Sequence, residues 1–225
     1  MPERPLPLAD ILEGIDAILF DMDGVLLDTE DLYTRATKQI LGPLGDRFDW
    51  RIKERMMGRA PLEAAKILID ALEVPITPQE YLDQKRPILL GLFRESEPKP
   101  GATELVQTLA ERGLPLAVAT SSDRGFFEAK TSHHPWFSHF QAIVCGSDPE
   151  VKAHKPAPDI FLAAAKRLRT PPSRCLVFED SAAGVESAKR AGVRRVVALA
   201  DANIDRALLS QADHVVDAFA QITGR

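Results

Sequence analysis

The second half of the chain alternates short apolar runs with amphipathic segments, and this alternation limits the possible folds more than any other feature. Helical stripes are expected over residues 102–112, 125–132, 158–168, 182–191 and 204–209. Short apolar runs separate them, at residues 114–119, 142–145, 175–178, 193–199 and 214–216. Strands that alternate with helices of about ten residues are typical of parallel sheets covered by helices. We therefore predict an α/β fold built on a doubly wound parallel sheet.

Residues 30–98 break this alternation, because every periodic segment within them reads as a helix. These segments are residues 32–41, 50–57, 61–72 and 78–93. A crossover between parallel strands needs only about a dozen residues and a helix, so this insertion is too long for a connection. We predict a core of residues 1–29 and 99–225 that carries a separate helical cap of residues 30–98. The alternative is one larger continuous domain.

The first apolar run of the core, residues 15–20, ends abruptly at Asp21 and Asp23. Gly24 follows and allows the chain to turn. In open α/β sheets, ligands bind just beyond the carboxyl ends of the strands, which is where these carboxylates are expected. Side chains two residues apart in a strand leave on the same side, and two anions held together need a cation or a shared proton. Asp-Gly is also an ordinary turn signal, so this pair alone leaves the function open.

Three further polar signals follow or precede expected elements of the core in the same way. Thr120 and Ser121 follow a strand, Lys155 stands just before a helix, and a third strand ends at Glu179 and Asp180. Each has a simpler interpretation, because hydroxyl side chains also cap helices and a lysine is usually solvated. Four such signals in order, each at a strand end or a helix start, favour a single site.

The residue types in this set suit phosphoryl transfer. Asp21, Asp23 and Asp180 offer the hard oxygen ligands that Mg²⁺ prefers, and the lack of a His/Cys cluster argues against zinc. Thr120 and Lys155 are suited to hold phosphate oxygens, and Lys155 also offsets the acidic cluster. A carboxylate can act as a covalent nucleophile, while a second one transfers protons.

The overall charge and the cysteine content restrict the partners and the cellular location. The net charge is −5, from 28 basic and 33 acidic residues, which argues against a nucleic-acid-binding surface. Cys145 and Cys175 stand in apolar runs and read as small buried residues rather than a disulfide or a metal pair. The sequence shows neither a secretory signal nor an apolar stretch long enough to span a membrane. These features predict a cytoplasmic protein without membrane contact.

Taken in order, these segments resemble the motifs of the haloacid dehalogenase-like hydrolase superfamily. The four matching segments are residues 21–29, Thr120, Lys155 and residues 179–180. The resemblance implies a Rossmann-like core with a helical cap inserted after the first strand. It implies that Asp21 is the nucleophile and that Asp23 is the general acid/base. It further implies that Asp21, the main-chain carbonyl of Asp23 and Asp180 bind Mg²⁺, with Glu179 as an outer-sphere or occasional direct partner.

The cap sequence, on Tyr33 and residues 57–59 and 62–70, is similar to the pseudouridine-5′-phosphatase branch of that superfamily, and so are the core segments 119–122, 130–133 and 146–151. A phosphatase acting on a small phosphorylated metabolite, with pseudouridine 5′-phosphate favoured, is our first expectation. A β-phosphoglucomutase-like enzyme is the alternative, although that family usually has a histidine where this chain has Tyr33. A non-catalytic binding or regulatory module is a third hypothesis. Arg59, in a loop between Gly58 and Pro61, is a possible substrate-binding residue of the cap, and a cap that must move suits a monomer.

Overall fold

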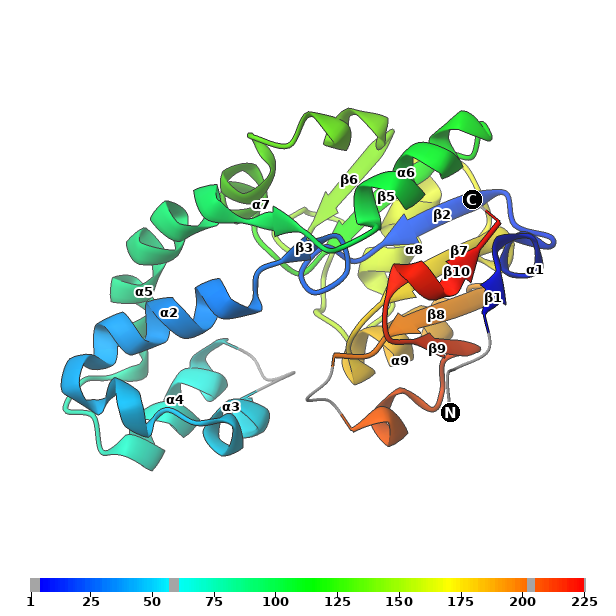
Figure 1. The fold of residues 1–225 in the computed structure, drawn as a ribbon. Helices are drawn as coiled ribbons and strands as arrows, with labels where there is room; N and C mark the ends of the chain where they lie inside the picture. The colour runs from blue at the N-terminus through cyan, green and yellow to red at the C-terminus, as the bar shows by residue number, and fades with distance from the viewer. Residues whose placement is uncertain (1–4, 57–60, 202–204, 225) are drawn as a thin grey trace. The chain divides into compact units, whose positions relative to one another are not determined.

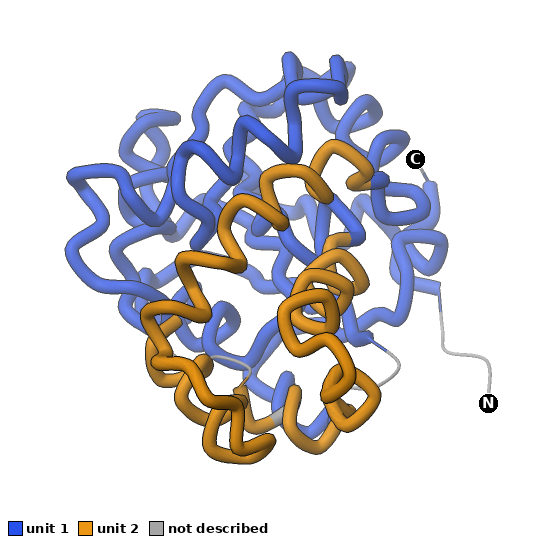
Figure 2. Tube along the Cα trace, turned by 90° about the vertical axis from the view of Figure 1, so that its left-hand side faces the viewer, with its two compact units in different colours: residues 1–28, 97–225 blue, residues 29–96 orange. Residues whose placement is uncertain are grey.

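The computed structural model describes residues 5–56, 61–201 and 205–224, and it divides the chain into two compact units. Figure 1 shows the fold, and Figure 2 colours the two units separately. One unit comprises residues 1–28 and 97–225, and we call it the core. The other comprises residues 29–96, and we call it the helical unit.

A six-stranded parallel sheet in the order β6-β5-β2-β7-β8-β9 forms the centre of the core. Its strands are β2 (Ala17–Phe20), β5 (Leu116–Thr120), β6 (Ala142–Cys145), β7 (Cys175–Glu179), β8 (Arg195–Leu199) and β9 (His214–Val216). The chain builds outward from β2 to β5 and β6, and then returns to the other side of β2 to add the remaining strands. This order reverses direction at β2, which is the place where doubly wound sheets bind their ligands. The predicted fold class is confirmed.

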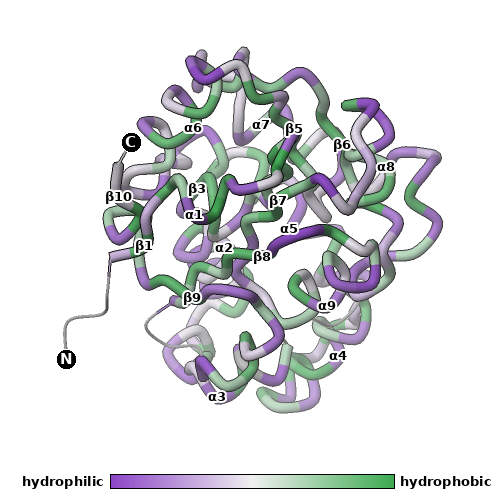
Figure 3. Tube along the Cα trace, turned by 90° about the vertical axis from the view of Figure 1, so that its right-hand side faces the viewer, coloured by the Kyte–Doolittle hydropathy of each residue, from purple (hydrophilic) through white to green (hydrophobic). Residues whose placement is uncertain are grey.

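Alternate residues of the buried strands contribute to two separate hydrophobic layers. In β2, Ile18 and Phe20 belong to one layer, and Ala17 and Leu19 belong to the other. This follows from the period of two along a strand, and a run without polar residues is what a sheet covered on both faces requires. Figure 3 shows the hydrophobic colouring of β7 and β8 inside the core.

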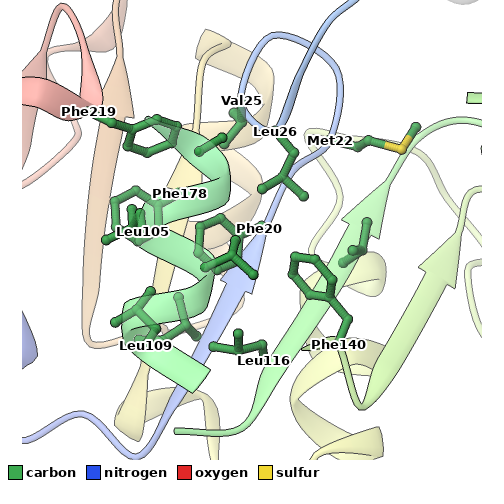
Figure 4. Close-up of a cluster of buried hydrophobic side chains, with 14 of the residues drawn as sticks. Phe20, Met22, Val25, Leu26, Leu105, Leu109, Leu116, Phe140, Phe178 and Phe219 are labelled. Carbon is green, nitrogen blue, oxygen red and sulfur yellow. The ribbon is translucent and has the colours of Figure 1, made fainter. Parts of the chain in front are cut away.

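Helices from both halves of the core sequence cover the two faces. Leu105 and Leu109 of α6 (Ala102–Glu111) pack on the layer that holds Phe20 and Phe178, as Figure 4 shows. Helices α1 (Leu8–Leu12) and α7 (Arg124–Thr131) contribute to the same layer. The opposite layer is closed by α8 (Asp159–Arg167) and α9 (Ala182–Arg190).

Two short ladders lie outside the main sheet. Strand β1 (Leu6–Pro7) pairs in parallel with β10 (Ile222–Thr223). Strand β3 (Leu27–Asp28) pairs antiparallel with β4 (Glu97–Pro98), so the two places where the chain leaves and re-enters the core lie side by side. The Lys99 N–H donates to the Leu26 carbonyl at 2.9 Å and extends this contact.

The helical unit contains α2 (Glu30–Leu41), α3 (Trp50–Met56), α4 (Pro61–Leu72) and α5 (Pro78–Leu92). Helix α5 begins with a capping box, in which Thr77 and Glu80 satisfy each other's backbone N–H groups. The unit has its own small core, which includes Leu41, Leu68 and Tyr81. The helical character expected for this stretch is therefore observed, and its role as a cap remains a prediction.

Among the described residues, no helix combines the length and the apolar character needed to cross a lipid bilayer.

Candidate active site

Four segments of the core bring polar side chains to the carboxyl ends of β2, β5 and β7. Asp21 directly follows β2, Thr120 is the last residue of β5, and Glu179 is the last residue of β7. Lys155 reaches the same place from the loop between β6 and α8, because its ammonium contacts both Asp21 and Glu179. The structure therefore brings Asp21, Lys155 and Glu179 into contact, and it places Thr120 at the end of a strand that pairs with β2.

The Lys155 ammonium bridges two buried carboxylates. Its Nζ lies 2.5 Å from Asp21 Oδ1 and 2.5 Å from Glu179 Oε1. The side chains of Lys155 and Asp21 are 8% and 9% exposed, and Glu179 is fully buried. The Phe161 ring, whose centroid lies 5.0 Å from Nζ, closes the apolar side of the lysine. Charged hydrogen bonds this sheltered from water are among the stronger ones in proteins.

Burial sets the protonation of this cluster. It raises the pKa of Asp21 to about 7, with the nearby Glu179 adding to the rise and Lys155 opposing it. For Lys155, burial alone would lower the pKa, but Asp21 and Glu179 outweigh it and hold the pKa above its ordinary value. Lys155 therefore stays positively charged, and it is the only charge in this triad that offsets the two acids.

Glu179 is fully engaged by protein donors. Its Oε2 accepts hydrogen bonds from the N–H groups of Asp180 and Ser181, at 2.8 and 2.9 Å, and from Ser181 Oγ at 3.0 Å. A Cβ at Gly184 would lie 1.7 Å from Glu179 Oε1, so the first turn of α9 must carry glycine there. One Glu179 oxygen thus contacts Lys155 and the other accepts hydrogen bonds at the start of α9, so both oxygens have protein partners.

Asp180 lies beside the turn that follows Asp23. A Cβ at Gly24 would lie 1.9 Å from Asp180 Oδ2, and Gly24 has a φ of +82°, so both space and conformation require glycine at this position. Burial raises the pKa of Asp180 well above its ordinary value, and the charges of Glu179 and Asp21 raise it further. A carboxyl group in this situation gains most from a bound cation.

The donor set of this site fits a hard divalent cation. No group of three or more His, Cys, Asp or Glu side chains gathers as a metal cluster in the part of the chain that the structure describes. The set implied by the family resemblance needs only two carboxylates, Asp21 and Asp180, together with the main-chain carbonyl of Asp23. Oxygen donors of this kind suit Mg²⁺. Burial is the main cause of the raised pKa values of both acids, and neighbouring carboxylates raise them further, so a bound cation would favour their charged forms.

Thr120 and Ser121 line the end of β5. Thr120 is buried, and its Oγ1 accepts a hydrogen bond from the Ser122 N–H at 3.1 Å. Ser121 is exposed at the surface of the core. Because β5 pairs with β2, which Asp21 directly follows, the two residues remain candidates for holding phosphate oxygens.

Asp23 is held by a second lysine, which lies on α7. Lys130 Nζ is 2.5 Å from Asp23 Oδ1, and Ser122 Oγ donates to Asp23 Oδ2 at 3.0 Å. Lys130 is fully buried, and the Asp23 side chain is 27% exposed. Each of the two aspartates that follow β2 is thus paired with its own lysine.

Sequence analysis assigned no role to Lys130 or to Ser122. A signal for Lys130 does exist in the pattern of α7, because it lies three residues after the buried Phe127 and next to the buried Thr131. Lysines are almost never fully buried unless they are paired. A lysine on the buried face of a helix therefore indicates an acidic partner. Arg59, the predicted substrate-binding residue of the cap, lies outside the described residues.

The helical unit contains a cavity of its own, with a volume of about 160 Å³. It is lined by Glu30, Tyr33, Thr34, Thr37, Phe48, Lys53, Met56, Ala64 and Lys85. Lys53 donates to Thr34 at 2.7 Å and pairs with Glu30 at 2.6 Å. Lys85 instead lies over the rings of Tyr33 and Tyr81, at 5.7 and 5.2 Å from their centroids.

Substitution of Lys85 by methionine is expected to raise the free energy of unfolding at pH 7 by about 1–3 kcal/mol. Burial lowers the pKa of Lys85 to about 8, against an ordinary value of 10.5. Below pH 8 the folded wild-type protein holds a charged amine away from water, which lowers its free energy of unfolding. Methionine carries no charge, so the variant lacks this desolvation penalty. Between pH 8 and 10.5 the unfolded chain keeps a proton that the folded protein has released, so wild type gains stability as the pH rises. The advantage of the variant should therefore shrink across this window.

Urea unfolding of both proteins at several pH values between 7 and 10 measures this difference. Lys66→Met serves as the control, because Lys66 is an exposed lysine of the same unit and pairs with the exposed Asp70 on the same helix. A Lys85→Met variant that is less stable than wild type at pH 7, or whose advantage does not change with pH, would contradict the expectation.

Comparison with known proteins places the chain in a family. Residues 15–192 match the model of the haloacid dehalogenase-like hydrolases. The chain is 42% identical over 214 residues to a Drosophila melanogaster protein named "Probable pseudouridine-5'-phosphatase", covering 93% of this chain and 92% of the relative. It is 39% identical over 209 residues to (DL)-glycerol-3-phosphatase 1, mitochondrial, of Arabidopsis thaliana, covering 90% of this chain and 70% of the relative.

A solved structure agrees with the sequence relatives. CbbY from Rhodobacter sphaeroides, crystallised in complex with phosphate, superposes with a TM-score of 0.75 at 30% identity. The match covers 92% of this chain and 95% of that one. The motifs read from sequence, the sheet order and the family match agree, and the chain belongs to the haloacid dehalogenase-like hydrolases.

Proposed function

We propose that the protein is a Mg²⁺-dependent phosphomonoester hydrolase that works through an aspartyl-phosphate on a small phosphorylated metabolite. The observation that carries the proposal is the pairing at the end of β2, where Asp21 contacts Lys155 and Asp23 contacts Lys130. One aspartate is suited to attack phosphorus, and the other, two residues on, is suited to move protons. The names of the relatives described above, which are phosphatases of small phosphorylated compounds, support this assignment.

In the first step, a carboxylate oxygen of Asp21 attacks phosphorus, and the bond from phosphorus to the leaving oxygen breaks. Asp23 supplies the proton that the leaving oxygen takes up, so the product alcohol departs neutral. Lys155 and Thr120 hold the phosphoryl oxygens as negative charge shifts among them. The enzyme then carries a phosphate ester on Asp21.

In the second step, water attacks phosphorus and the bond to Asp21 breaks. Asp23, which lost its proton in the first step, accepts a proton from that water. Inorganic phosphate is released and both aspartates return to their starting states. The Asp21 and Asp180 carboxylates and the Asp23 carbonyl would hold Mg²⁺, which supplies positive charge to the phosphoryl oxygens when bound.

The substrate class that we favour is a phosphorylated polyol, sugar or nucleoside, with pseudouridine 5′-phosphate first. The relatives named for pseudouridine 5′-phosphate and for glycerol 3-phosphate support this choice. We assign the selection of the leaving group to the helical unit as a cap, with Arg59 as a substrate contact. The proposed form is a monomer acting in the cytoplasm, and the free, buried thiols of Cys145 and Cys175 support a reducing compartment.

Phosphate release from a substrate panel, with Mg²⁺ and with EDTA, tests the proposed function. The panel contains pseudouridine 5′-phosphate, glycerol 3-phosphate, hexose 6-phosphates, fructose 1-phosphate and β-glucose 1-phosphate. UMP is the matched control for pseudouridine 5′-phosphate, because the two differ only in how the base is joined to the ribose. We expect release from at least one member, and we expect EDTA to remove at least nine-tenths of it, with recovery on adding Mg²⁺.

Two results would contradict the proposal. Conversion of β-glucose 1-phosphate to glucose 6-phosphate without release of phosphate would identify a mutase. No turnover of any member, in a folded protein supplied with Mg²⁺, would favour a binding or regulatory module.

A further inference from the structure

Among the described residues, Lys130 is the one lysine that is fully buried, with 0% of its surface exposed. Removing an ammonium from water costs several kcal/mol unless charged and hydrogen-bonding partners replace the water. Here those partners are Asp23 Oδ1 at 2.5 Å and Ser122 Oγ at 2.9 Å. A buried cation aimed at a residue two positions after the proposed nucleophile points to a role at that residue.

Lys130, Ser122 and Asp23 close a triangle of hydrogen bonds. Ser122 Oγ accepts from Lys130 and donates to Asp23 Oδ2 at 3.0 Å, while Lys130 donates to Oδ1. The two oxygens of the carboxylate are thus held by different donors. Rotation of the carboxylate would break at least one of these bonds, so the triangle fixes the orientation of Asp23.

The triangle joins three separate segments of the core. Asp23 belongs to the turn after β2, Ser122 belongs to the loop after β5, and Lys130 lies near the end of α7. Asp123 is the N-cap of α7, and its side chain accepts the Phe126 N–H at 2.9 Å. This cap sets the rotation of the helix, which buries Phe127 and Lys130 on one face.

We propose that Lys130 is a positioning residue of the hydrolase: together with Ser122 it holds the Asp23 carboxylate in the orientation from which Asp23 exchanges protons with the leaving oxygen and with water. The inference rests on the proposed function, because it concerns the proton transfers assigned to Asp23. Lys130 touches neither substrate nor metal in this scheme. It acts through Asp23 alone, whereas Lys155 serves Asp21 and Glu179.

Lys130→Met, Asp23→Asn and the double variant test the proposal, with kcat and KM measured for glycerol 3-phosphate or the best substrate of the panel. General acid–base catalysis contributes about 10²–10⁴-fold, and misplacing the acid should lose part of it. We expect Lys130→Met to lower kcat by about 10- to 100-fold with KM changed less than about threefold. In the Asp23→Asn background, the same change should lower kcat by less than about threefold, because the group it positions is gone.

A second substrate separates positioning from general damage. The nitrophenolate of p-nitrophenyl phosphate leaves without needing a proton, so kcat/KM for this ester should fall much less than kcat/KM for an alkyl phosphate. Asp23→Asn should likewise lose less kcat/KM for p-nitrophenyl phosphate than for an alkyl phosphate. Lys166→Met, which removes an exposed lysine of α8, is the matched control and should behave as wild type.

The outcomes are distinct. Equal losses for both esters, or a loss from Lys130→Met that persists undiminished in Asp23→Asn, would make Lys130 a structural ion pair and overturn the proposal. Wild-type kinetics in Lys130→Met would overturn it as well. If Lys130→Met does not fold, Ser122→Ala removes one of the two bonds to Asp23 and must show the same ester preference. Failure of the proposed function is recognised separately, since wild type itself would then release no phosphate.

Discussion

Substitution of Asp21 by asparagine is expected to lower turnover by about 10⁴-fold or more. An amide of nearly the same size cannot form the phosphate ester that the proposed mechanism requires, so the loss should appear in kcat. The fold should survive, because Asp21 lies in a cluster with Glu179 and Asp180 where one negative charge fewer reduces repulsion. The measurement is the rate of phosphate release, with thermal unfolding to establish that the variant is folded.

Asp16→Asn is the matched control for this change. Asp16 precedes the opposite, amino end of β2, is about half exposed and pairs with Arg174. It should keep wild-type turnover. Acid-quenched wild type incubated with labelled substrate should carry phosphate on Asp21, and Asp21→Asn should carry none. Substantial turnover by a folded Asp21→Asn protein would remove Asp21 as the nucleophile.

The sheet could be predicted because its strands are buried on both faces and therefore lack polar residues. β2, with four fully buried residues, and the last strands of the core were recognised as apolar runs, and the observed bounds differ by only a few residues at either end. The alternation of strands with helices led to the prediction of a doubly wound parallel sheet, because parallel strands are joined by helical crossovers. The two-residue ladders of β1 with β10 and β3 with β4 were not predicted, because two residues carry no periodic signal.

The acidic part of the site could be predicted because charges at the end of an apolar run stand out from their surroundings. Asp21, Glu179 and Lys155 were expected together and lie in contact. The resemblance implied Asp180 as a metal ligand and Glu179 as an outer-sphere or occasional direct partner, but it did not show how Glu179 is held, because that depends on which of its oxygens the start of α9 binds. That detail follows from tertiary packing around Gly184 and not from the residue types.

Lys130, in contrast, could not be assigned to the site from the sequence. A lysine within a helix is usually solvated, and the spacing of Lys130 from Phe127 is too weak a signal to predict its burial before the rotation of α7 is known. The cavity in the helical unit is similar, since it brings together residues from four helices. Residues that act through long-range packing need the structure, whereas residues that interrupt a strand pattern do not.

Substitution of Lys155 by methionine is expected to lower turnover by about 10³-fold and to lower the free energy of unfolding by about 3–5 kcal/mol. Lys155 is the cation that holds Asp21 and Glu179 at 2.5 Å each, and its loss leaves two buried carboxylates without that partner. The loss of activity follows from the same charge, which would otherwise stabilise the phosphoryl oxygens. Phosphate-release kinetics and urea unfolding measure the two effects. Mg²⁺ should raise the melting temperature of the variant more than that of wild type, because it would supply positive charge to Asp21, which has lost its lysine partner.

Lys152→Met is the control, since Lys152 is an exposed lysine three residues earlier in the same loop. The double variant Lys155→Met with Glu179→Gln separates the two roles of Lys155. Removing the Glu179 charge leaves fewer unpaired negative charges in the cluster. The double variant should therefore recover part of the lost free energy of unfolding. It should not recover turnover, because the phosphoryl group would still lack its cation. Recovery of both stability and turnover would show that Lys155 is only a structural counter-ion. Phosphate binding would then be assigned to Thr120 and Ser121.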